Sequence, residues 1–93
     1  MTGPADWVHE RLLVLRCQVG DPLAFEELVL LYQPRLRYFL HAMLRGDRDV
    51  EDHLQEIWLD VYRGIARLAT PASFGAWLYR IARNRAFRHS RKS

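Results

Sequence analysis

DVEDHLQEIWLDVYRGI, residues 49–65, has the residue spacing of an amphipathic helix. Its apolar side chains return every three or four residues, and these are Val50, Leu54, Ile57, Trp58, Val61 and Ile65. An apolar stripe needs other apolar faces to cover it, so the stretch predicts a helix packed in a bundle. We expect this helix to begin at Asp47, because acidic residues stabilise the positive end of the helix dipole.

The same helical period continues upstream. Asp21 followed by Pro22 predicts a helix start, since a carboxylate caps the first N–H groups and proline fits the first turn. Apolar residues then recur at helical spacing, namely Phe25, Leu28, Val29, Tyr32, Leu36, Phe39, Leu40 and Met43. Pro34 falls inside this run and is expected to kink or split the helix, and Gly46 is expected to end it.

A shorter helix is expected near the N-terminus, from a cap at Asp6 to a stop near Gly20. The face expected to pack inward consists of Val8, Leu12, Leu15 and Val19. Trp7 and Trp58 are expected in the core. Cys17 is the single cysteine, which excludes an intrachain disulfide and fits a reducing compartment, and it is expected to be buried and unreactive.

The charges divide the chain into two parts. Residues 1–60 hold six basic and eleven acidic residues, a net of −5 (6 − 11). Residues 61–93 hold eight basic residues and no acidic one, and Phe74, Trp77, Tyr79 and Phe87 are interleaved with the bases. Cations interleaved with flat rings indicate a nucleic-acid partner, because they match both its phosphates and its bases.

A fourth helix is expected to start between residues 70 and 73, after the turn signal Thr70-Pro71. Its expected inward face consists of Phe74, Leu78, Ile81 and the stem of Arg85. Its expected outward face consists of Arg80, Arg83, Asn84, Phe87 and Arg91. The prediction is therefore all-α, a small helical bundle of three main helices plus an N-terminal helix, in one domain over residues 1–93.

No arrangement of residues indicates catalysis, a metal or a cofactor. The histidines show no ligand spacing, no Ser/His/Asp or Cys/His pattern is found, and the glycines are too scattered for a phosphate loop. The N-terminal segment lacks the apolar run of a signal peptide, and no stretch approaches the length of a membrane span. We expect a cytoplasmic protein that is not an enzyme and binds no cofactor, metal or membrane.

Three stretches resemble a known family. DVEDHLQEIWLDVYRGI, a seven-residue loop and SFGAWLYRIARNRAFRHSRKS are similar to region two of bacterial sigma factors of the extracytoplasmic-function (ECF) type. GDPLAFEELVLLYQPRLRYFL resembles the start of the same domain, so the resemblance covers residues 14–92. It implies a transcription initiation domain that binds the clamp helices of core RNA polymerase and reads the melted −10 promoter element on the non-template single strand.

The resemblance implies further parts of the system. An anti-sigma factor is an implied protein partner. A second helical domain, which reads the −35 element, is implied as well and is absent from this sequence, and residues 90–93 would begin the linker to it.

The resemblance assigns polymerase binding to the acidic helix. The residues implied are Asp49, Asp52, Gln55, Glu56, Leu59, Asp60 and Arg63. Leu59 lies amid this polar face and is a candidate anchor. An apolar side chain that is desolvated at the centre of an interface contributes affinity, while the charges around it set the register.

The resemblance assigns single-stranded DNA to the loop and the last helix. The residues implied are Arg67, Leu68, Thr70, Ser73, Trp77, Arg80, Ile81, Arg83, Asn84 and Arg88. Leu68, Ser73, Ile81 and Asn84 would line a pocket for a flipped base, which needs an apolar wall and an amide for its edge. Trp77 would face the melted fork. The loop reads RLATPAS, with Leu68 where many relatives have an aromatic residue, which leaves the base preference open.

Two other functions stay open from the sequence. A helix-turn-helix module would read duplex DNA, although its short turn is unlike the seven-residue loop here. A protein-interaction module without a DNA role would use the acidic helix for one protein and the basic helix for another partner or a membrane surface. Salt-sensitive binding to a single strand would favour the sigma-like function over both.

Overall fold

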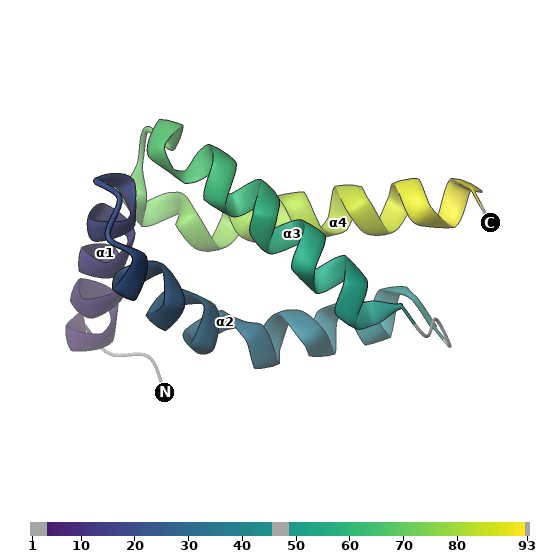
Figure 1. The fold of residues 1–93 in the computed structure, drawn as a ribbon. Helices are drawn as coiled ribbons and strands as arrows, with labels where there is room; N and C mark the ends of the chain where they lie inside the picture. Colours follow the sequence, from purple (N-terminus) through teal and green to yellow (C-terminus); the bar gives the residue numbers. More distant parts are fainter. Residues whose placement is uncertain (1–3, 46–48, 93) are drawn as a thin grey trace.

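The computed structural model describes residues 4–45 and 49–92 (Figure 1). Within these ranges the helices are α1 (Pro4–Gln18), α2 (Pro22–Met43), α3 (Val50–Gly64) and α4 (Phe74–Lys92). Two short 3-10 turns, η1 (Ile65–Arg67) and η2 (Pro71–Ser73), connect α3 to α4. The described residues contain no β-strand, which confirms the predicted all-α bundle.

α2 begins where the Asp21-Pro22 pair predicts. The Asp21 carboxylate accepts hydrogen bonds from the backbone N–H groups of Leu23 and Ala24, at 3.0 and 3.4 Å. The Arg16 guanidinium also pairs with this carboxylate at 2.8 Å. That hydrogen-bonded pairing, followed by the bonds from the helix N–H groups, lowers the pKa of Asp21.

α2 runs without a break through Pro34, so the expected split does not occur. Pro34 has no N–H to donate to the carbonyl of Leu30 in the preceding turn. Because Leu30 is 73% exposed, that carbonyl can bond water instead. The helix ends at Met43, and the stop expected at Gly46 lies outside the described residues.

α3 buries the stripe that the sequence predicts. Its residues Val50, Leu54, Ile57, Trp58 and Val61 are all buried. The Trp58 indole, the most exposed of them at 8%, donates a hydrogen bond to the Gln33 side-chain oxygen at 2.6 Å. The described helix starts at Val50 with Asp49 at its cap position, and Asp47 lies outside the described residues.

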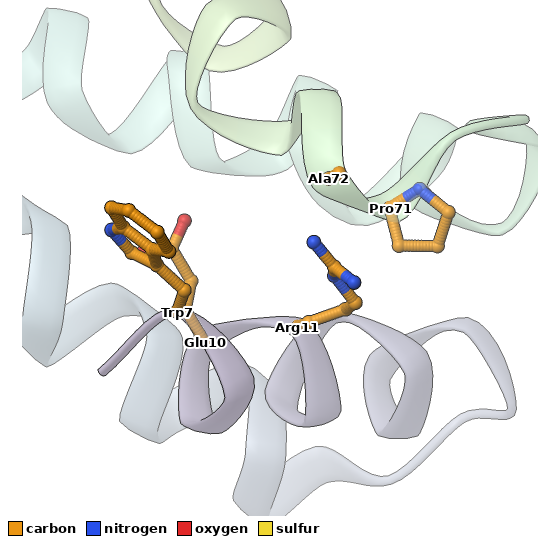
Figure 2. Close-up of a pocket in the computed structure, with 5 residues that line it drawn as sticks. All are labelled: Trp7, Glu10, Arg11, Pro71 and Ala72. Atoms are coloured by element: carbon orange, nitrogen blue, oxygen red, sulfur yellow. The ribbon is translucent and has the colours of Figure 1, made fainter. Parts of the chain in front are cut away.

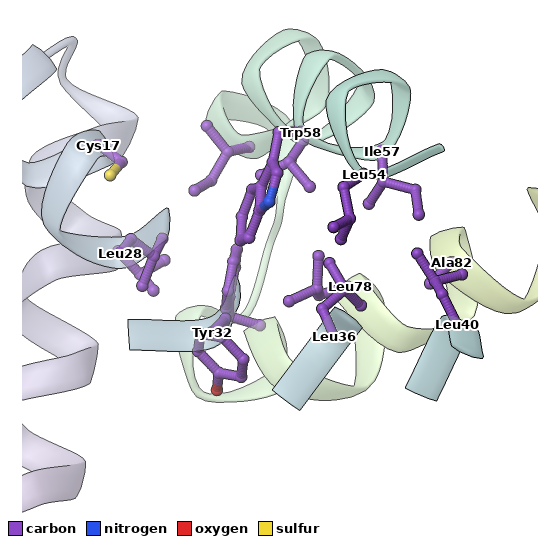
Figure 3. Close-up of a cluster of buried hydrophobic side chains, with 14 of the residues drawn as sticks. Cys17, Leu28, Tyr32, Leu36, Leu40, Leu54, Ile57, Trp58, Leu78 and Ala82 are labelled. Carbon is purple, nitrogen blue, oxygen red and sulfur yellow. The ribbon is translucent and has the colours of Figure 1, made fainter. Parts of the chain in front are cut away.

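The core lies where these helices face one another (Figure 3). Its fully buried members include Leu28, Leu36, Leu40, Leu54, Ile57, Phe74, Leu78 and Ala82. Burial of one large apolar side chain stabilises the fold by about 1.5–3 kcal/mol. α4 therefore packs on the other helices through Phe74, Leu78 and Ala82.

α1 packs with a different face from the one expected. It buries Leu13, Val14 and Cys17, whereas Val8, Leu12, Leu15 and Val19 are 43–85% exposed. The sequence has four apolar residues in a row at 12–15, so periodicity allows either face to turn inward. The contacts of α1 with α2 and the two turns select the other face.

Two further expectations for α1 are wrong. Trp7 is 57% exposed and lies outside the core, although Trp58 is buried as expected. The helix starts at Pro4, so Asp6 lies inside it instead of capping it. α1 stands across one end of the bundle, where it meets the start of α2 and both 3-10 turns (Figure 1). None of the described helices is long and apolar enough to cross a membrane.

Candidate nucleic-acid and polymerase interfaces

The connection between α3 and α4 is ordered by its own backbone. The Leu68 N–H bonds the Ile65 carbonyl at 3.1 Å, and the Ser73 N–H bonds the Thr70 carbonyl at 2.9 Å. Leu68 is partly buried against the core, whereas Arg67, Thr70 and Ser73 are exposed. Nine residues, 65–73, separate the two helices, which is far from the tight turn of a helix-turn-helix.

Gln18 at the end of α1 also fixes this connection, through a contact that no local sequence pattern indicates. Its Nε2 donates hydrogen bonds to the carbonyl oxygens of Ile65 and Leu68, at 3.0 and 2.7 Å. Ile65 and Leu68 lie 47 and 50 positions after Gln18 in the chain. A glutamine in the last turn of a helix carries no local sign of such a contact, because the contact forms only when the fold brings the loop against the helix.

α4 separates its core side from its cationic side. Phe74, Leu78, Ala82 and Ala86 are buried, with Ile81 and Arg85 at the edge of that face. The exposed residues in the described part of this helix are Ala76, Arg80, Arg83, Asn84, Phe87 and Arg88. The predicted outward face is therefore confirmed for Arg80, Arg83, Asn84 and Phe87, while the side chain of Arg91 lies outside the described part.

One edge of α4 brings together four of the predicted DNA-binding residues. Trp77, Ile81, Asn84 and Arg88 follow one another at spacings of four, three and four, which places them in one row along the helix. Arg83 lies about 160° around the helix from Ile81. A single DNA strand that follows this row would not pass Arg83, which could contact only a phosphate elsewhere on the DNA.

Trp77 sits against the end of α3. A Cβ added to Gly64 would lie 3.0 Å from Cζ2 of the Trp77 ring. The ring also packs beside Phe74, with 6.0 Å between ring centroids. Trp77 is thus half-buried: its ring packs against Gly64 and Phe74, and part of the side chain stays accessible to solvent.

The predicted polymerase-binding residues line the outer side of α3. Asp49, Asp52, Gln55, Glu56 and Arg63 are exposed, and Leu59 is 45% exposed among them. An apolar groove of about 640 Å³ runs beside this side, between α2 and α3. Phe25, Leu59 and Tyr62 line it, and the Phe25 and Tyr62 rings meet edge to face at 5.4 Å.

Asp60 pairs with a cationic side chain of α4, Arg85. Its carboxylate accepts a hydrogen bond from Arg85 Nε at 2.7 Å, and Glu56 lies 3.5 Å from the same guanidinium. The side chains of Asp60 and Arg85 are only 29% and 24% exposed. The hydrogen bond to Asp60 raises the pKa of Arg85, and the pair ties the acidic helix to the basic one.

Other titratable groups show no arrangement for chemistry in the described residues. The His53 and His89 rings lie 4.6 Å apart, but no group of three potential ligands gathers within residues 4–45 and 49–92. Cys17 is buried, as expected, and desolvation raises the pKa of its thiol.

Comparison with known proteins identifies the family that this arrangement matches. Residues 28–93 match the family described as Sigma-70 region 2. The RNA polymerase sigma-H factor of Pseudomonas aeruginosa is 35% identical over 81 residues, which are 87% of this chain and 42% of that protein. The ECF RNA polymerase sigma-E factor of Escherichia coli K12 is 36% identical over 82 residues, 88% of this chain and 42% of that protein.

A solved structure is similar over most of its length as well. It is an NMR structure of an engineered region 2 of sigmaE in complex with GTAAAA. It shares 35% identity, covers 86% of this chain and 83% of its own, and superposes with a TM-score of 0.78. The present chain spans about two fifths of the length of the curated relatives it matches.

Proposed function

Because this chain belongs to the Sigma-70 region 2 family, we propose that it is the promoter-reading domain of an ECF-type transcription initiation factor. It would bind the clamp helices of core RNA polymerase through α3. It would bind the −10 promoter element as a single strand through the loop at 65–73 and α4. Both roles would be carried out in the cytoplasm, where polymerase and promoter meet.

The proposed DNA surface joins an apolar wall, an amide and cations. Leu68 and Ile81 are partly buried and supply the wall for a flipped base, and the exposed Asn84 amide offers a donor and an acceptor to its edge. Arg80 and Arg88 flank Asn84 by one turn on either side, where they can hold successive phosphates.

The proposed polymerase surface joins acidic side chains to an apolar groove. Asp52, Gln55 and Leu59 lie on one side of α3, and Leu59 also borders the groove beside Tyr62. A helix that carries basic and apolar residues would pair with the carboxylates and place its apolar side chains against Leu59 and Tyr62. Tyr62, which is 68% exposed, therefore joins the residues that we assign to this surface.

One observation favours this function over the alternatives. The ion pair between Asp60 and Arg85 holds the acidic helix directly against the basic one, so two surfaces of opposite charge lie on adjacent helices of one small domain. Such a domain can contact a basic protein and a polyanion at the same time. This separation of acidic and basic surfaces favours a domain with two partners over a module with one partner.

Binding of a labelled 12-nucleotide single strand containing GTAAAA tests the DNA role. We expect tighter binding to the single strand than to its duplex, and a sharp penalty when one base is replaced. Affinity should fall with salt at a slope of about −0.7 per phosphate contact, so Arg80→Ala should reduce the slope by about that amount.

Arg37→Ala is the matched control, because Arg37 already pairs with Glu51 at 2.7 Å on another part of the molecule. It should leave the slope unchanged. Equal affinity for single strand and duplex, with no base dependence, would reduce the surface to a general cationic patch.

A further inference from the structure

A pocket outside the two proposed interfaces lies between α1 and the η2 turn. It has a volume of about 250 Å³ and is lined by Trp7, Glu10 and Arg11 of α1 and by Pro71 and Ala72 of η2 (Figure 2). Ala72 is followed directly by Ser73, which is assigned to the proposed base pocket. The two sites therefore share the short η2 segment.

The side chains of this pocket have the chemistry of a nucleobase site. The Trp7 indole is 57% exposed, which is unusual for the largest apolar side chain, and its face is available for stacking. Arg11 extends from α1 toward Pro71 and Ala72, at the opposite end of the pocket from Trp7 (Figure 2). Its exposed guanidinium can hold the phosphate of a nucleotide whose base stacks on Trp7.

Glu10 lies beside Trp7 and adds a fixed acceptor to this end of the pocket (Figure 2). The Tyr32 hydroxyl donates a hydrogen bond to Glu10 Oε1. Burial, followed by that hydrogen bond, raises the pKa of Tyr32, so the hydroxyl keeps its proton and orients the carboxylate. A carboxylate accepts hydrogen bonds only, so it suits a base edge that carries an amino group and disfavours thymine in the same orientation.

We propose that this pocket binds a second base of the same single strand, next to the flipped one. The inference rests on the proposed DNA role and extends it from α4 to α1. Trp7 stacks on the base, Glu10 accepts from its amino group, and Arg11 contacts its phosphate. The strand would thus contact both α4 and α1, with η2 shared by the two sites.

The test is a base scan of the GTAAAA strand, in which each base in turn is replaced by an abasic site. The wild type should show penalties at two neighbouring positions. Trp7→Ala should weaken binding by roughly fivefold to a hundredfold, the range of base–aromatic stacking, and should abolish the penalty at one position only. Asn84→Ala should abolish the penalty at the other.

Two further variants complete the test. Glu10→Gln keeps an acceptor for Tyr32 but adds a donor, so the preference for an amino-bearing base over thymine at the Trp7 position should fall several-fold. Tyr38→Ala removes another exposed aromatic, 79% accessible on α2, and should change nothing. Since Trp7 is exposed, its removal leaves no cavity in the core.

The outcomes separate the two claims. If the wild type binds the strand and depends on Asn84 while Trp7→Ala binds with unchanged affinity, the second base site is wrong and the proposed DNA role stands. If the wild type binds no member of the strand series, both claims are overturned.

Discussion

One residue that is far from the loop in the sequence, Gln18, helps to hold the loop in its conformation. Gln18 donates to two loop carbonyls, and Gln18→Leu keeps most of the side-chain volume while it removes both hydrogen bonds. We expect a loss of about 1–2 kcal/mol in the free energy of unfolding, because the Leu68 carbonyl loses the Gln18 donor and the Ile65 carbonyl keeps only the Leu68 N–H. Chemical denaturation measures this loss, and the abasic scan should show weaker discrimination at the flipped base.

Gln55→Leu is the matched control for that prediction, since Gln55 is exposed on α3 and does not contact the loop. It should leave stability and the scan close to those of the wild type. Identical stability of the Gln18 and Gln55 variants would show that the loop does not depend on α1.

The stability of the fold should depend measurably on pH through the Asp21 carboxylate. Its pKa is lowered in the folded state by Arg16 and by the helix N–H groups. The contribution to stability is therefore complete above the ordinary pKa of an aspartate and is lost as the pH falls through the lowered value. Asp21→Asn keeps a capping oxygen but cannot be protonated in this range, so its melting temperature should fall less between pH 5 and pH 2.

The acid scan needs a second carboxylate for comparison. Glu51, whose pKa is lowered by Arg37, should contribute in the same direction, so Glu51→Gln should also flatten the profile. An unchanged profile in both variants would contradict the assigned pairings.

At the scale of helices, Gly64 sets how closely α3 and α4 approach at the loop end. A Cβ at this position would lie 3.0 Å from the Trp77 ring, so Gly64→Ala must move the indole by a few tenths of an ångström. We expect a shifted NMR signal of the Trp77 indole N–H and weaker strand binding. An unmoved signal would mean that the contact has more room than the structure gives it.

The pair of Asp60 and Arg85 should stabilise the packing of α3 on α4. Both side chains are largely shielded from water, so their coupling should exceed that of an exposed ion pair. A double-mutant cycle with Asp60→Asn and Arg85→Met should give a coupling of about 1 kcal/mol in the free energy of unfolding.

A cycle on the more exposed pair of Arg37 and Glu51 provides the comparison. If both cycles give the same small value, the Asp60–Arg85 pair does not hold the two helices together. A larger coupling for Asp60–Arg85 would also bear on function, because weaker polymerase binding by Asp60→Asn must then be corrected for lost stability.

Much of this architecture can be predicted from the sequence because each main helix carries one dominant signal. The stripe of α3, the Asp21-Pro22 start of α2 and the cationic face of α4 all follow from spacing and charge. α1 is the exception, since its run of four apolar residues fits two faces and only tertiary contacts choose between them.

The candidate sites divide in the same way. The exposed faces of the helices could be predicted from spacing and charge, whereas the resemblance to a known family singled out Asp52 and Asn84 on those faces. The roles of Gln18 and Gly64 depend on contacts between distant segments, which no local pattern encodes. The assignment of bases and polymerase contacts to these residues stays a prediction.

For the whole molecule, the central claim is that two partners bind two separate surfaces. The direct measurement is the affinity of Asp52→Lys and Asn84→Ala for core RNA polymerase and for the GTAAAA single strand. Asp52→Lys should lose at least about tenfold in polymerase binding and retain the strand, and Asn84→Ala should do the reverse. Loss of both partners in either correctly folded variant, or of neither partner in both variants, would contradict the division.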